Sequence, residues 1–120
     1  MLTPINKAGV RKLINFINLL VRVSIIMTQQ QNITRRYFVS YSGIKLPLKL
    51  VNEITEDSLH NRNTYFCGHF DVNNQLLRCQ KIVYGEVECE HIYSYHTNGA
   101  LKLAEITEED ETRTLSFPEN

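Results

Sequence analysis

The hydrophobic pattern of the chain changes near residue 27. Up to that point the sequence is rich in Leu, Ile and Val and contains basic but no acidic residues. Polar side chains recur every three or four positions in this stretch, at Lys7, Arg11, Asn15, Asn18 and Arg22. This spacing places them on one stripe of a helix, and the rest of the circumference is apolar. The pattern predicts an amphipathic helix from Val10 to Met27.

After residue 34 the period changes from that of a helix to that of a β-strand. Short segments rich in β-branched and aromatic residues are separated by turn residues. The expected strands are residues 36–41, 44–51, 64–70, 75–84, 86–96 and 100–107, with a short seventh strand at 112–117. Pro47 lacks an N–H donor, so the second strand is expected at a sheet edge. The predicted fold is mainly β: an antiparallel β-meander of six or seven strands, as a single sheet or small open barrel, with one N-terminal amphipathic helix.

Residues 70–76 (FDVNNQL) and 95–101 (YHTNGAL) form a weak internal repeat. Each copy begins with an aromatic residue and ends with Leu, and both contain Asn at the equivalent position. The pattern predicts one hairpin unit used twice. In the second copy, Asn98-Gly99 favours a two-residue type I′ turn, in which both residues need positive φ.

The chain is predicted to have three parts. These are an amphipathic helical extension at 1–27, a flexible lead-in at 28–34 and a β-meander domain at 35–117. Met27 offers an alternative start, so it stays open whether residues 1–26 belong to the native protein. If they do, the helix could pack against the β domain or a partner, or make peripheral membrane contact through residues 10–27. A membrane span is not expected, because Arg22 ends the uncharged run that starts at Leu13.

Several strings of the sequence resemble a small bacterial family of unknown function. They are YSGIKLPL at 41–48, NRNTYF at 61–66, KIVYGEVE at 81–88 and YHTNGAL at 95–101. The resemblance covers about residues 35–106 and leaves out the first 27 residues. The hairpin repeat is also weakly similar to the units of MORN-type and related β-hairpin repeat proteins. These resemblances imply binding or scaffolding by analogy and supply neither an activity nor a catalytic residue.

The charges are unevenly distributed, although the net charge is zero. Residues 1–52 contain eight Lys or Arg and no acid, whereas residues 53–120 contain all thirteen acids. This division is expected either from two differing surfaces of one domain or from a surface used for association. Cys67, Cys79 and Cys89 have no disulfide-framework spacing, which favours reduced thiols in a cytoplasmic protein.

A double Cys-x-His pattern, Cys67/His69 and Cys89/His91, is the sharpest candidate for metal chemistry. Two Cys and two His are a common ligand set of structural zinc sites, and residues i and i+2 of a strand share a face. Two-residue turns would nevertheless leave a whole strand between the two pairs. The preferred register, with a three-residue loop at 72–74, puts the pairs on opposite faces. No metal site is therefore favoured, and no cofactor is expected.

Two further patterns bear on catalysis. Glu86, Glu88 and Glu90 alternate along one strand, which is typical of the solvated face of a half-buried sheet. Lys81 is expected to pair with Glu88 across the hairpin. Cys89 and His91 could be a nucleophile and its base, but positions two apart on a strand are separated by about 7 Å. The sequence therefore predicts no catalytic residue.

A candidate basic patch is formed by Arg35, Arg36, Lys45 and Lys49, with aromatic residues interspersed. Such combinations on a β surface can bind single-stranded nucleic acid. The alternative is a strand whose aromatic residues face the core and whose cations face water. The neutral total charge argues against nucleic acid as the partner.

The leading functional hypothesis is a small non-catalytic binding or scaffold module. Its partner would be a protein or a second copy of the chain, bound through the sheet face or the N-terminal helix. One alternative is a ligand- or zinc-binding β domain that uses Cys67, His69, Cys89 and His91. A second alternative is a nucleic-acid-binding β surface.

Overall fold

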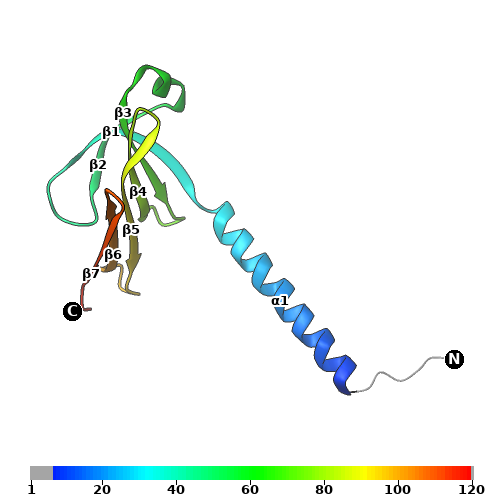
Figure 1. Ribbon diagram of the computed structural model, residues 1–120. Coiled ribbons are helices and arrows are strands. Elements are labelled where there is room, and N and C mark those ends of the chain that lie inside the picture. Colours follow the sequence, from blue (N-terminus) through cyan, green and yellow to red (C-terminus); the bar gives the residue numbers. More distant parts are fainter. Residues whose placement is uncertain (1–6, 120) are drawn as a thin grey trace. The chain divides into compact units, whose positions relative to one another are not determined.

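The computed structural model describes residues 7–119, with side chains described for 9–23 of the helix and for 32–119. The chain divides into two compact units, Met1–Asn32 and Ile33–Asn120. The first unit contains one helix, α1 (Lys7–Gln31), and the second contains the seven strands (Figure 1).

Helix α1 confirms the predicted helical segment and is longer than expected. Residues 28–31, for which the sequence predicts a flexible lead-in, belong to the helix. Thr and Gln are tolerated in helices, and neither Pro nor Gly interrupts the run, so nothing in the local sequence ends the helix at Met27. Within residues 7–119, no helix combines the length and apolarity needed to cross a membrane.

The second unit is a seven-stranded antiparallel sheet with the order β2-β1-β3-β4-β5-β6-β7. The strands are β1 (Thr34–Ser42), β2 (Lys49–Ile54), β3 (Thr64–Phe70), β4 (Leu76–Val83), β5 (Glu86–Tyr95), β6 (Leu101–Glu108) and β7 (Glu111–Ser116). A 3₁₀ helix, η1 (Glu56–Asn61), connects β2 to β3. From β3 to β7 each strand pairs with the next, whereas β1 lies between β2 and β3. Because β2 and β7 are edges, the sheet is open, and the predicted mainly β fold is confirmed (Figure 1).

The hydrophobic core lies on one face of the sheet, called the core face below. Its cluster of buried residues is Phe38, Phe66, Leu76, Cys79, Tyr93 and Ala104. Directly paired residues of neighbouring strands point to the same face, and Phe38 pairs with Phe66 just as Tyr93 pairs with Ala104. The opposite face is called the outer face.

The connection between β1 and β2 covers part of the core face. Leu46 and Leu48 of the connection pack against the core cluster, as does Leu50 of β2. The Leu48 amide donates a hydrogen bond of 3.1 Å to the Tyr93 hydroxyl. The predicted strand at 44–51 is therefore wrong in its first half, because β2 begins only at Lys49. The alternating leucines reflect burial against the sheet, and Pro47 has no N–H with which to join a ladder.

The internal repeat corresponds to two hairpin loops with the same hydrogen bonds. Asp71 N–H bonds to Gln75 O and Asn74 N–H to Asp71 O, and residues 96, 99 and 100 repeat both bonds in the second loop. The type I′ turn predicted at Asn98-Gly99 is wrong, because only Gly99 of that pair has positive φ. Each closing pair instead encloses three residues, the last of which is left-handed.

Two-residue turns with positive φ at both positions occur elsewhere. They are Tyr84-Gly85, between β4 and β5, and Glu109-Asp110, between β6 and β7. This geometry matches the right-handed twist of the flanking strands, so each turn holds its two strands in a tight hairpin.

Candidate functional site

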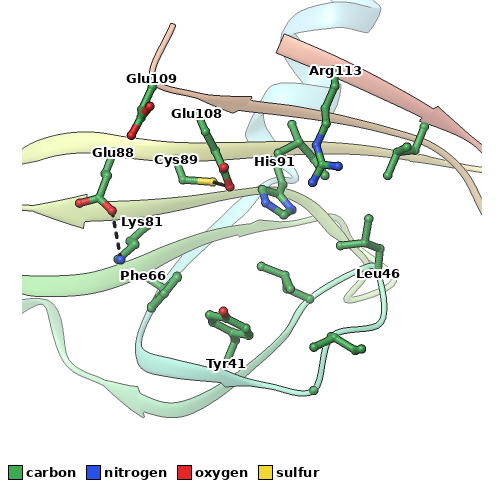
Figure 2. Close-up of a pocket in the computed structure, with 15 residues that line it drawn as sticks. Tyr41, Leu46, Phe66, Lys81, Glu88, Cys89, His91, Glu108, Glu109 and Arg113 are labelled. Carbon is green, nitrogen blue, oxygen red and sulfur yellow. Dashed lines mark hydrogen bonds and ion pairs between the residues drawn. The ribbon is translucent and has the colours of Figure 1, made fainter. Parts of the chain in front are cut away.

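A groove of about 560 Å³ opens on the core face beside the β1–β2 connection. Its lining residues come from that connection, from strand β1, from strands β3 to β7 and from the β6–β7 turn, all within the β unit. Figure 2 shows an apolar part at the β1–β2 connection and a polar part along β5 to β7. The two parts differ in the chemistry they offer.

The apolar part is called the apolar wall and consists of Tyr41, Ile44, Leu46, Leu48 and Phe66. Ile44 is 97% exposed, although it is a large hydrophobic residue. The rings of Tyr41 and Phe66 meet edge to face with a centroid distance of 5.5 Å, which fixes that end of the wall. Exposed apolar surface in a hollow is a recurring feature of ligand sites.

The polar part contains Cys89, His91 and Glu108, called the Cys-His-Glu cluster. Cys89 and His91 share the core face of β5, and Cys89 pairs directly with Glu108 on β6. The Cys89 thiol donates a hydrogen bond of 3.4 Å to Glu108 Oε1. One sulfur, one ring nitrogen and one carboxylate oxygen of the cluster lie within 4.8 Å of one another. Figure 2 shows the three side chains on the same side of the groove.

His91 is held in place by a short chain of hydrogen bonds. The residue is only 8% exposed, and its Nδ1 lies 2.7 Å from the Tyr93 hydroxyl oxygen. That oxygen also accepts the Leu48 amide, so the β1–β2 connection supports the histidine indirectly. Burial lowers the pKa of His91, which favours the neutral ring. Because Nδ1 is engaged, Nε2 is the nitrogen available to a ligand.

Cys89 is not arranged as an activated nucleophile. Burial, followed by the hydrogen bond with Glu108, raises the pKa of its thiol to about 11, so the thiol is protonated at neutral pH. Its sulfur lies nearer to the His91 ring than the spacing of about 7 Å expected from strand geometry, because side-chain rotamers shorten the backbone separation. The thiol proton nevertheless points to Glu108, so His91 does not receive it.

Charged residues of both signs border the cluster. Lys81 Nζ lies 3.1 Å from Glu88 Oε1, which confirms the predicted cross-hairpin pair. Arg113 of β7 and Glu109 of the β6–β7 turn also line the groove (Figure 2). Together with Glu108, three carboxylates face two cations, so the groove has a small excess of negative charge.

The double Cys-x-His pattern does not form one site. Cys67 pairs with Tyr37 and lies on the outer face, as does His69, whereas Cys89 and His91 lie on the core face. The observed strand register is therefore the predicted one, with a three-residue loop at 72–74. Sequence reasoning missed Glu108, because the strand predicted at 100–107 ends one residue before it and nothing in the local sequence indicates that Glu108 pairs with Cys89.

The predicted basic patch is divided between the two faces. Arg35 and Arg36 are neighbours on β1, so their side chains leave the strand in opposite directions. The Arg36 guanidinium donates hydrogen bonds of 2.8 and 2.9 Å to the two carboxylate oxygens of Glu53, which neutralises its charge locally. Lys45 lies in the β1–β2 connection and Lys49 begins β2.

The fold and the groove define the second unit as an open antiparallel β module with a hollow on its core face. Residues 29–120 match a family of unknown function, DUF6156, and the chain belongs to this family. The match agrees with the resemblance carried by the motifs between residues 41 and 101. No curated protein and no solved structure matches the chain.

Proposed function

We propose that the β unit is a non-catalytic binding module whose groove takes a small, uncharged, mainly apolar molecule. The observation that supports this function is the exposed apolar wall inside a groove of about 560 Å³. Ligand pockets have volumes of about 300–1,000 Å³ and combine mainly apolar walls with a few polar groups. A molecule seated on the wall would cover Ile44, which the fold leaves exposed.

An uncharged ligand fits the electrostatics of the groove. Lys81 and Glu88 neutralise each other, and Arg113 lies among the remaining carboxylates. Because the polar part contains both cations and carboxylates, a strongly charged organic molecule of either sign would lie close to a group of the same charge. The apolar wall therefore supplies most of the free energy of binding, and the polar part selects the orientation.

A binding function without catalysis accords with the chemistry of the groove. The Cys89 thiol is protonated at neutral pH, and its proton is donated to a carboxylate. The Arg36–Glu53 ion pair gives no support to a nucleic-acid surface, since phosphate contacts need unpaired cations. A cytoplasmic, bacterial protein is part of the same proposal, supported by three free cysteines and by the motif resemblance.

The test uses Nile red, a neutral apolar dye whose fluorescence rises in apolar surroundings, titrated into the full chain. We expect one saturable site per chain. The Ile44→Ser variant should bind about fivefold more weakly, which corresponds to about 1 kcal/mol and lies within the value of burying one isoleucine. Val72→Ser is the matched control, because Val72 is also a highly exposed aliphatic residue but does not line the groove.

Equal weakening by Ile44→Ser and Val72→Ser would show that the dye does not use the groove. Dye binding that appears only when the near-ultraviolet circular dichroism is lost would show binding to an unfolded state. A dimer that forms with rising protein concentration and expels the dye would assign the groove to a second copy of the chain, and a peptide or protein that does so would assign it to a protein partner.

A further inference from the structure

We propose that the Cys-His-Glu cluster is a binding site for a divalent transition-metal ion of the zinc type, with one coordination position open to the groove. This inference goes beyond the binding of an apolar molecule and does not depend on it. It rests on three side chains that converge from two neighbouring strands, β5 and β6.

The donor atoms select the class of metal. Thiolate sulfur, imidazole nitrogen and carboxylate oxygen are the three ligand types that zinc accepts, and three protein ligands leave the fourth tetrahedral position for an exchangeable group. Calcium and magnesium prefer sites made only of oxygen, so a thiol and an imidazole disfavour them. The open position would face the groove, where water or a polar group of a ligand could occupy it.

The geometry is close to that of a tetrahedral centre. Bonds of about 2.3 Å to sulfur and about 2.0 Å to oxygen place those two ligands about 3.5 Å apart around zinc. The Cys89 sulfur and Glu108 Oε1 are already 3.4 Å apart. All three ligand atoms lie within 4.8 Å, so a small rotation of the side chains brings the His91 nitrogen into range. The direct pairing of Cys89 with Glu108 fixes the backbone beneath them.

The protons balance when the ion enters. A metal–sulfur bond forms and the Cys89 thiol proton leaves to water. His91 binds through Nε2, with its ring proton on Nδ1 and donated to the Tyr93 oxygen. A histidine that binds a metal typically donates its second N–H to a fixed acceptor in this way, which orients the ring. The Tyr93 hydroxyl stands 2.7 Å from Nδ1 and is suitably placed for that role.

The surrounding charge also suits a divalent cation. Three carboxylates and the Cys89 thiolate would exceed the two cations of the groove by two negative charges, which one divalent ion neutralises. Arg113 is the opposing feature, since its positive charge acts directly on His91. Removing that charge should therefore tighten the binding of a cation.

The experiment is a titration of the full chain, purified free of metal, with Co²⁺, followed by displacement with Zn²⁺. We expect one Co²⁺ per chain, a thiolate-to-cobalt charge-transfer band in the near ultraviolet, and loss of the band when Zn²⁺ is added. Cys89→Ser should abolish the band. Cys67→Ser should keep it, because Cys67 lies on the outer face.

Glu108→Gln should weaken Co²⁺ binding by about tenfold or more, since changes even in the groups that support metal ligands cost about 10–100-fold. Glu105→Gln is its matched control, because Glu105 is an exposed glutamate of the same strand that pairs with Ile92 on the outer face. Arg113→Gln should tighten binding. Unchanged circular dichroism establishes that each variant is folded.

Three results would overturn the metal site: no charge-transfer band, a band that survives Cys89→Ser, or equal weakening by Glu108→Gln and Glu105→Gln. Cobalt binding and Nile red binding are read by separate signals, with the dye measured on metal-free protein. Failure of one therefore leaves the other standing.

Discussion

His69 occupies an electrostatically unfavourable place on the outer face. It pairs with Arg35 on β1 and Arg78 on β4, and its Nδ1 is buried without a hydrogen-bond partner among the described residues. Burial first, and then the charges of Arg78 and Arg35, lower the pKa of His69, whereas Glu90 acts in the opposite direction. The folded chain therefore favours the neutral ring.

This lowered pKa predicts acid sensitivity. An unfolded histidine has a pKa of about 6.5, so below that pH the unfolded state takes up the proton more readily than the folded state. The contribution of the neutral His69 to the free energy of unfolding should therefore be retained above about pH 6.5 and be lost progressively as the pH drops towards the folded-state pKa.

Chemical denaturation of the parent and of His69→Gln, at several pH values between about 5 and 8, measures this effect. The variant should show a shallower fall in the free energy of unfolding. The difference between the two proteins isolates His69, because His60, His91 and His96 are present in both. Identical pH dependence would show that the His69 ring does not stay neutral in the folded state.

At the scale of elements, the local sequence indicates the geometry of some hairpin turns more clearly than that of others. The loops at 70–76 and 95–101 share their hydrogen bonds, which explains the internal repeat. The turn at Tyr84-Gly85 has the tighter two-residue geometry, although Tyr84, with φ of 50°, is a bulky residue in a left-handed conformation. Such a residue costs about 1–2 kcal/mol relative to an ordinary backbone conformation.

Replacing Tyr84 by Asn should therefore stabilise the β4–β5 hairpin, because Asn adopts the left-handed conformation more readily. We expect the free energy of unfolding to rise by about 0.5–1 kcal/mol, measured by urea denaturation. Tyr84→Ala is the control, since it removes the same exposed ring without easing the backbone. Equal stability of the Asn and Ala variants would attribute any gain to the loss of the ring.

At the scale of the whole molecule, the core cluster and its cover both belong to the second unit. The buried residues of the core face come from β1 and β3–β6, and two of the leucines that pack on them, Leu46 and Leu48, come from the β1–β2 connection. The division of the chain into two compact units and the family match at 29–120 both leave most of α1 outside the β unit.

A fragment of residues 29–120 should therefore fold on its own. We expect it to keep the near-ultraviolet circular dichroism of the full chain, apart from any signal of Phe16, and to unfold cooperatively in denaturant. Its transition midpoint should match that of the full chain. Aggregation of the fragment, or loss of cooperative unfolding, would instead show that α1 is needed to cover apolar surface of the sheet.

The amino-acid sequence by itself determined the type and approximate position of most elements of this protein. A period of 3.6 predicted α1, and alternation with turn residues predicted most strands, because both signals depend on neighbouring residues. The Lys81–Glu88 ion pair could also be predicted from the sequence, since the two residues belong to one hairpin. Cys89 and His91 stood out as candidate ligands because they lie two positions apart on a strand.

Only the tertiary structure decided which of those elements, and which of their side chains, come into contact. The alternating pattern in residues 44–51 is the same whether the leucines belong to a strand or lie over the core face. Their packing beside Tyr93 could therefore be recognised only in the folded sheet. Strand order is likewise not local, and β1 lies between β2 and β3. The Cys-His-Glu cluster joins β5 to β6, and Cys89 and Glu108 are separated by 19 positions in the sequence. Only the antiparallel register brings that sulfur and that carboxylate together.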